Sequence, residues 1–130
     1  MKHVYLLITC LNLLDQVLKE RFTEILDRRL LDRSLWKMIQ SGHFPGWFAR
    51  EFHYDALYSH LSGLREALSF ASNNGLLRLD GSEFHYHLEL SERVVDTLLE
   101  DILFERKEVR MLALELSGLL SQALALKIVH

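Results

Sequence analysis

Three polar side chains in the middle of the chain have the spacing of metal ligands. His85, His87 and Glu89 alternate along one predicted strand, so all three point to the same side of it. Two imidazoles and a carboxylate are acceptable zinc ligands, but a tetrahedral site needs a fourth ligand or an open water position, and no neighbour in sequence supplies one. Exposed polar residues on a solvated hairpin explain the same pattern, so we expect no metal and no other cofactor. The two histidines could instead titrate near neutral pH and gate an interface.

Nucleophilic chemistry has candidates of the right type but without partners. They are one cysteine and four serines in stretches with helical periodicity: Cys10, Ser59, Ser62, Ser69 and Ser72. None has an identifiable base and orienting acid, and the chain has no glycine-rich phosphate loop, so we expect no enzyme. A single cysteine excludes a disulfide within the chain, favours a reducing compartment and predicts a buried, unreactive thiol.

Positive charge gathers in one short stretch. Its residues are Arg28, Arg29, Arg33 and Lys37. They could contact phosphates or an acidic protein, but Asp27 and Asp32 lie among them, so a solvated helix face is the alternative interpretation. The whole chain has a net charge of -3, and no global positive field therefore draws it to nucleic acid or to an anionic membrane.

The composition predicts one mainly helical domain over residues 1–130. The 130 residues are 49% hydrophobic and 25% charged, with only one proline and six glycines to interrupt helices. The most apolar long stretch, residues 111–130, contains Glu115, Gln122 and Lys127, which are costly in hydrocarbon, so we expect no membrane contact. A soluble, cytoplasmic protein is the corresponding expectation.

Residues 1–41 are predicted to form the N-terminal helices. Apolar residues recur there at steps of three and four, as in an amphipathic helix: Leu11, Leu14, Leu18, Phe22, Ile25 and Leu26. A shift in phase beyond these residues suggests a bend or a second helix near residues 32–34. The only proline and two glycines then mark an aromatic turn segment over 42–54.

The aromatic segment allows two interpretations. Phe44, Trp47 and Phe48 either fill the core where two helical layers meet or form an exposed docking surface for another protein. We count these three residues among the candidate partner-binding positions.

Residues 55–90 are predicted to form a helix and then a β-hairpin. The helix runs over 55–73, begins at Asp55 as its cap and ends at Asn73-Asn74-Gly75. Alternation through the turn at Asp80-Gly81-Ser82 then predicts a hairpin with one apolar and one polar face. The apolar face holds Leu77, Leu79, Phe84, Tyr86, Leu88 and Leu90. The polar face holds Arg78, Glu83, His85, His87 and Glu89.

Residues 91–130 are predicted to form one long C-terminal helix capped by Ser91. Apolar residues alternate at steps of three and four from Val95 onward, which is typical of a coiled-coil seam. The distal seam positions proposed for partner binding are Val109, Leu112, Leu116, Leu119, Ala123 and Leu126. A straight helix over residues 91–127, about 55 Å long at 1.5 Å per residue, would be too long for a body of this size to cover, so its distal end would need a partner. The alternative is a break near residues 105–107 that folds the helix back.

The order of these central elements resembles the second half of a winged-helix domain. The resemblance covers residues 56–100: a helix, its end at Gly75, a hairpin and a helix capped by Ser91. It implies either a dimeric regulator similar to the PadR family or an adaptor similar to the small middle subunits of prokaryotic ATPase-containing defence systems. In regulators of the first kind the helix before the wing enters the major groove.

The charges of this sequence do not favour that use of the helix. Within 55–74 the only full positive charge is Arg65, which Glu66 answers, and the hairpin adds only Arg78. We therefore expect a mainly α (α+β) fold with one β-hairpin, a winged-helix-like centre and a long C-terminal helix. The expected function is a non-catalytic interaction subunit or adaptor that forms homo- or hetero-oligomers. The alternative is a winged-helix DNA-binding transcriptional regulator that uses the cationic residues named above.

Overall fold

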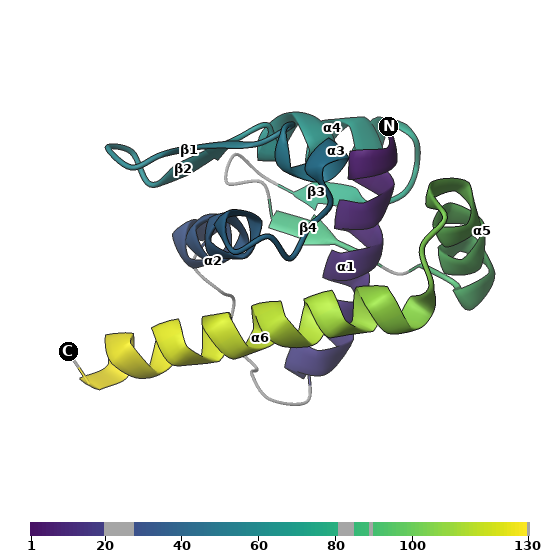
Figure 1. The fold of residues 1–130 in the computed structure, drawn as a ribbon. Helices are drawn as coiled ribbons and strands as arrows, with labels where there is room; N and C mark the ends of the chain where they lie inside the picture. Colours follow the sequence, from purple (N-terminus) through teal and green to yellow (C-terminus); the bar gives the residue numbers. More distant parts are fainter. Residues whose placement is uncertain (20–27, 81–84, 89, 130) are drawn as a thin grey trace.

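The computed structural model describes residues 1–19, 28–80, 85–88 and 90–129, and within these ranges the side chains of residues 19, 28, 80, 85, 86 and 124–129 are not described. Figure 1 shows the arrangement of its elements. Their order is α1 (Lys2–Lys19), α2 (Arg28–Gln40), α3 (Gly46–Ala49), β1 (His53–Asp55), β2 (His60–Ser62), α4 (Leu64–Asn73), β3 (Arg78–Asp80), β4 (His85–His87), α5 (Glu92–Ile102) and α6 (Arg106–Val129).

Helix α1 forms the centre of the fold. It packs against α3, α4, α5 and α6, and Leu6, Ile8 and Leu11 each have 0% of their surface exposed. Its two buried polar side chains are hydrogen-bonded: Thr9 Oγ1 donates to the carbonyl oxygen of Tyr5 at 2.8 Å, one turn earlier, and Asn12 Oδ1 accepts from the distant backbone N–H of Leu90 at 3.4 Å. A helix that is apolar on all sides must be covered on all sides, and the later helices supply that cover.

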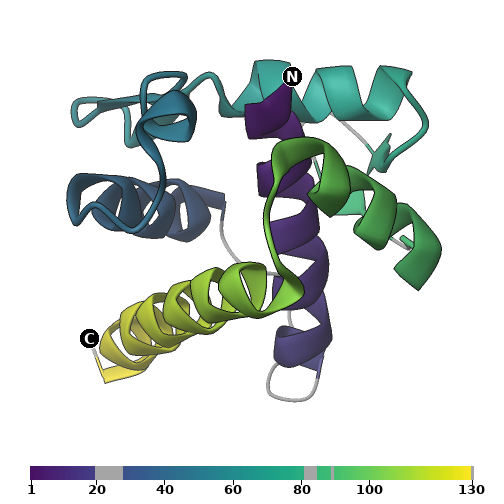
Figure 2. The same ribbon diagram turned by 45° about the vertical axis from the view of Figure 1, so that its right-hand side comes forward.

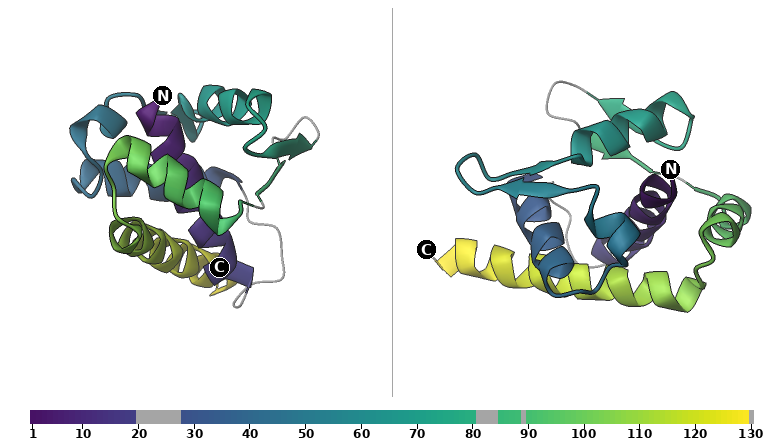
Figure 3. Two further views of the ribbon diagram at one scale, coloured as in Figure 1. Left: turned by 90° about the vertical axis from the view of Figure 1, so that its right-hand side faces the viewer. Right: turned by 45° about the horizontal axis from the view of Figure 1, so that its top comes forward.

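Helix α6 lies along the base of the molecule and packs against both α1 and α2 (Figure 3). The long C-terminal helix is therefore confirmed, but it begins at Arg106 rather than at residue 91. The continuous seam over 91–130 was a wrong prediction, and the alternative of a break near residues 105–107 is closer to the structure. The two helices diverge from this break instead of forming a tight antiparallel pair (Figure 2).

The break lies at Leu103, which adopts a left-handed conformation with φ of 58°. The N–H of Phe104 donates to the carbonyl of Leu99, and the N–H of Leu103 donates to that of Glu100, which is the hydrogen-bond pattern of a Schellman C-terminus. Phe104 then packs edge-on against Trp47, with ring centroids 5.9 Å apart. Since glycine usually occupies the left-handed position, a leucine there gave no sequence signal of a helix end.

The predicted helix over 55–73 is also wrong in its first half. Residues 53–62 form an antiparallel strand pair, with Tyr54 opposite Leu61, and α4 begins only at Leu64. Asp55 does not cap a helix, because its Oδ1 accepts from the N–H of Leu57 in the turn between the strands. The fold thus has a second strand pair besides the expected hairpin.

Gly63 is the reason that the strand pair can join α4 directly. Its φ is 96°, a conformation that side chains rarely adopt, and a Cβ at this position would overlap the carbonyl oxygen of Glu51. The end of α4 matches the prediction: the helix stops at Asn73, and Gly75 has a φ of 74°.

The strand pair formed by β3 and β4 confirms the predicted hairpin. Leu79 lies opposite Tyr86 and Arg78 opposite His87, so the predicted alternation of faces holds. Leu77 and Leu88 are buried, whereas the side chains of Arg78 and His87 are exposed. Residues 81 and 82 of the predicted turn lie outside the described residues, and so do three of the predicted face residues, Glu83, Phe84 and Glu89.

The bend expected near residues 32–34 does not occur. Helix α2 runs from Arg28 to Gln40 and continues through these positions. The shifted apolar phase that suggested the bend reflects a second helix with its own buried face. The structure confirms a mainly α (α+β) fold with a long C-terminal helix.

Substitution of Gly63 tests the junction between β2 and α4. We expect Gly63→Ala to lower the free energy of unfolding by at least about 2 kcal/mol, because it combines a left-handed alanine with a steric overlap. Urea unfolding followed by circular dichroism measures the change. Gly118→Ala is the matched control: it lies inside α6 with open space around its Cα, and it should stabilise the protein by about 0.5–1 kcal/mol. Equal effects of the two substitutions would contradict the junction described.

Substitution of Leu103 tests the break between α5 and α6. We expect Leu103→Gly to stabilise the protein by about 0.5–1 kcal/mol, because the left-handed strain disappears and the side chain, 86% exposed, contributes little packing. Leu103→Ala, which keeps a Cβ, should bring no such gain. A loss of stability in the glycine variant, measured by the same urea unfolding, would show that the two helices are continuous.

Candidate nucleic-acid interface

The exposed face of α2 carries cations and an amide. The exposed side chains described on this helix are Arg29, Arg33, Lys37 and Gln40. Arg29, Arg33 and Lys37 follow one another at intervals of four residues, so they form one row, about 6 Å apart along the helix axis. We call this row the basic ridge.

The basic ridge is not explained by helix stability. Like charges four residues apart destabilise a helix by a few tenths of a kcal/mol per pair. Within the described part of the chain, Arg33 and Lys37 make no ion pair that would offset this repulsion. Arg33 and Lys37 therefore repel each other and face solvent, and such exposed cations attract negatively charged partners.

The acidic residue on α2 that seemed to dilute this charge points inward. Asp32 is 3% exposed, and its Oδ2 accepts from the backbone N–H of Leu61 on β2 at 3.0 Å. Asp32 is therefore not among the exposed side chains of α2, because its carboxylate anchors the β1–β2 pair to α2. Asp27, the other acidic residue in the stretch, lies outside the described residues.

Aromatic side chains join α2 to the neighbouring strand pair. The indole of Trp36 stacks on the ring of Tyr54, with centroids 6.1 Å apart and planes 19° from parallel, and meets His53 edge-on. At the far end of the strand pair, Leu57 and Tyr58 are 81% and 73% exposed. The strand pair lies alongside α2, and its turn projects from the body (Figure 1).

Two of the other predicted nucleic-acid contacts are not on α2. Arg65 lies on α4 and Arg78 on β3, each exposed and each outside the basic ridge. Arg28 begins α2, but its side chain is not described. The structure therefore brings together Arg29, Arg33 and Lys37 and separates Arg65 and Arg78 from them.

The seam residues predicted to bind a partner are used within the chain. Val109, Leu112 and Leu116 are 0%, 7% and 0% exposed in the core that α6 shares with α1 and α2. Leu119 and Ala123 are half-buried against the same core, and the side chain of Leu126 is not described. An exposed apolar seam at these described positions was thus a wrong expectation, because α1 and α2 offer it a surface to cover.

The aromatic segment also packs inward. Phe44 stacks on Phe48 at 4.2 Å between centroids, and Phe48 contacts Phe52 at 4.8 Å. Phe44 and Phe48 are buried, and Trp47 is half-buried against Phe104. These three residues therefore fill the core, and the prediction that they form an exposed docking surface is wrong.

The thiol and the histidines that could do chemistry lie outside the basic ridge. Burial raises the pKa of the Cys10 thiol to about 12, in agreement with the predicted buried thiol. Burial also lowers the pKa of His3, although Glu51 opposes that shift. His87 is exposed, while the side chain of His85 and all of Glu89 lie outside the described residues; among those described, no group of three or more metal-ligating side chains occurs.

Sequence reasoning missed a second basic group, Arg106, Lys107 and Arg110 at the start of α6. The predicted continuous helix placed these residues mid-helix beside acidic neighbours, and only the break at Leu103 sets them at a helix start. The spacing of Arg106 and Arg110 by four residues was the available signal.

Comparisons with known proteins find no matching family model, no similar curated protein and no similar solved structure. In the part of the chain that the structure describes, none of the helices has the combined length and apolar character needed to cross a membrane.

Removal of the Asp32 carboxylate tests how the strand pair is held on α2. We expect Asp32→Ala to lower the free energy of unfolding by about 1–3 kcal/mol, because the buried N–H of Leu61 loses its acceptor. Asp32→Asn keeps an acceptor oxygen and should cost less. Asp55→Ala removes a similar bond in an exposed turn and serves as the control. Urea unfolding and amide exchange at Leu61 measure the effect, and unchanged exchange at Leu61 in Asp32→Ala would contradict the anchor.

Proposed function

We propose that this protein is a non-catalytic binding module that docks on the phosphate backbone of nucleic acid through the basic ridge. One observation carries the proposal: the described exposed side chains of α2 are three cations and one amide, while Asp32 is turned into the protein. Guanidinium and ammonium groups neutralise phosphates, and this neutralisation supplies most of the affinity in binding that does not depend on sequence.

Nucleic acid fits this face better than an acidic protein does. The centre of a protein–protein interface is apolar, whereas the described exposed face of α2 offers no apolar side chain. The fork-shaped guanidinium groups of Arg29 and Arg33 suit phosphate oxygens, and Gln40 adds an amide. The stacked Trp36 and Tyr54 hold the ridge in place beside the strand pair.

This proposal relocates the binding surface expected from the winged-helix resemblance. The resemblance would use α4, but α4 exposes Arg65 next to Glu66, whereas α2 exposes a row of cations. An adaptor role through α6 has less support, because the described seam residues are largely buried in the chain's own core. We retain the cytoplasmic location as part of the proposal, since nucleic acid is present there.

The salt dependence of binding tests this function. We expect a fluorescently labelled 20-base-pair duplex to bind with a dissociation constant in the range of about 10⁻⁴–10⁻⁶ M, with a slope of log K against log salt of about −2 to −3, because about three phosphates are neutralised. The double substitution Arg33→Gln with Lys37→Gln should reduce the magnitude of that slope by about 2. Fluorescence anisotropy between 50 and 200 mM salt (about the range over which such affinities change steeply) measures both.

A matched pair of charge removals provides the control. Lys2→Gln with Arg93→Gln removes two exposed cations from α1 and α5 and should leave the slope unchanged. Equal losses in the two double variants would mean that net charge, and not the ridge, governs binding. If Arg65→Gln were the one variant that lost DNA binding, the binding site would lie on α4. Tighter binding of poly-L-glutamate than of a duplex with the same charge would replace nucleic acid by an acidic protein.

A further inference from the structure

A groove lies between the second half of α1 and the start of α6, away from the basic ridge. Its volume is about 560 Å³, within the range of small-molecule sites in proteins. Helix α1 contributes Leu13, Gln16 and Val17 to its walls. Helix α6 contributes Arg106, Lys107, Arg110 and Ala113.

The groove combines an apolar floor with a cationic rim. Leu13 and Val17 are half-buried and Ala113 is 1% exposed, so the floor is apolar and already part of the packed body. Lys107 and Arg110 are exposed at the rim and make no ion pair with any other described residue. This division of apolar and charged surface matches a ligand that has an apolar body and an anionic end.

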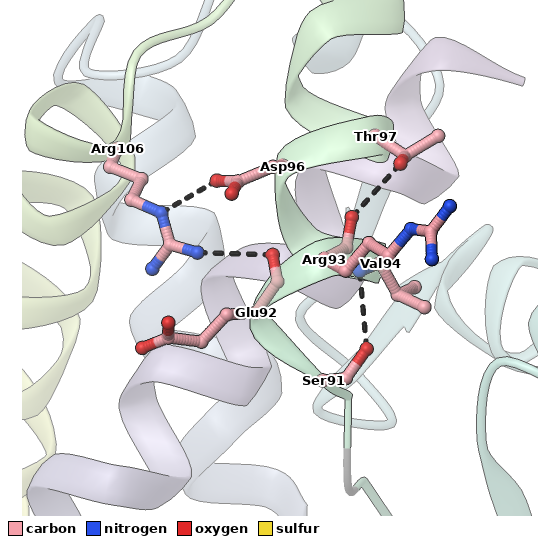
Figure 4. A network of polar contacts seen from close by, with 7 residues as sticks. All are labelled: Ser91, Glu92, Arg93, Val94, Asp96, Thr97 and Arg106. Atoms are coloured by element: carbon pink, nitrogen blue, oxygen red, sulfur yellow. Dashed lines mark hydrogen bonds and ion pairs between the residues drawn. The ribbon is translucent and has the colours of Figure 1, made fainter.

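Arg106 is held in position by α5, as Figure 4 shows. Its Nε donates to Asp96 Oδ1 at 2.7 Å, and its Nη2 donates to the carbonyl oxygen of Glu92 at 3.1 Å. The hydrogen bond to Asp96 raises the pKa of Arg106. A guanidinium has five N–H donors, so three remain for a ligand after these two bonds, and the side chain does not have to be ordered on binding.

The nearby carboxylates add little negative charge to the rim, because they are engaged elsewhere or do not line the groove. Asp96 is engaged with Arg106, and Glu108 Oε1 accepts from the N–H of Glu105, which turns this carboxylate toward the start of α6. Asp15 is adjacent in sequence to Gln16, but it does not line the groove. The described rim is therefore cationic, with the amide of Gln16 as a further hydrogen-bonding group.

We propose that this groove binds a small organic anion: a carboxylate, sulfonate or phosphate monoester attached to an aromatic or short aliphatic body. The anionic end meets Lys107, Arg110 and the remaining N–H groups of Arg106. The apolar body lies against Leu13 and Val17. This site is independent of the proposed nucleic-acid function, because it uses α1 and α6 and none of the basic ridge.

Titration of the full chain with 8-anilinonaphthalene-1-sulfonate, an aromatic sulfonate whose fluorescence rises on binding, tests the proposal. We expect saturable binding at one site, with amide shifts in nuclear magnetic resonance spectra concentrated at Gln16, Val17 and Arg110. Decanoate should displace the probe, and decan-1-ol, which has the same chain length but no charge, should not. The double substitution Lys107→Gln with Arg110→Gln should weaken binding about tenfold or more, because it removes two charge-assisted contacts.

The matched control is Arg33→Gln with Lys37→Gln, which removes the same charge from α2 and should leave probe binding unchanged. Equal weakening in the two double variants, equal displacement by decanol, or amide shifts spread over the whole chain would each overturn the proposal. Displacement of the probe by duplex DNA would also overturn it, because the groove would then be part of a nucleic-acid surface. Circular dichroism confirms that each variant is folded before it is titrated.

Discussion

The burial of α1 is the constraint on which the rest of the fold depends. Between Val4 and Leu14 this helix has apolar side chains on every side, and burying each large one is worth about 1.5–3 kcal/mol. No single neighbour can cover such a helix, so α3, α4, α5 and α6 each cover a different part of its surface. The turn at Leu103 follows from this requirement, because it lets α5 and α6 pack on α1 in different directions.

The same constraint decides which surfaces remain available to other molecules. The apolar face of α6, which by its length and pattern could have held a second chain, is used to cover α1 and α2. On α2 the Asp32 carboxylate is buried against β2, so the described exposed side chains of this helix are cations and one amide. The two surfaces with concentrated positive charge, the basic ridge and the groove at the start of α6, are what this packing leaves exposed.

The sequence predicted those elements whose ends carry their usual chemical markers. Gly75 marked the end of α4, Ser91 marked the start of α5 through the bond from the N–H of Val94, and strict alternation marked the faces of β3 and β4. The errors occurred where the marker was absent or misread. Leu103 takes a conformation usually given to glycine, and Gly63 lay inside a run whose apolar spacing also fitted a helix.

Only part of the basic ridge could be predicted from the sequence, because the rest depends on contacts between residues far apart in the chain. The spacing of Arg29, Arg33 and Lys37 by four residues shows in the sequence that they share a helix face. The sequence does not show which way the Asp32 side chain points, because this depends on the backbone N–H of Leu61, 29 positions away in the chain. The groove depends in the same way on contact between α1 and α6, which pattern alone does not specify.

Helix α6 covers α1 of its own chain, and amide hydrogen exchange over a range of protein concentrations, down to the lowest that can be detected, tests this packing. We expect residues 109–120 to be protected as strongly as residues 4–14, and we expect dilution to leave this protection unchanged. Loss of protection in α6 on dilution, with recovery on concentration, would show instead that a second copy of the chain covers the helix.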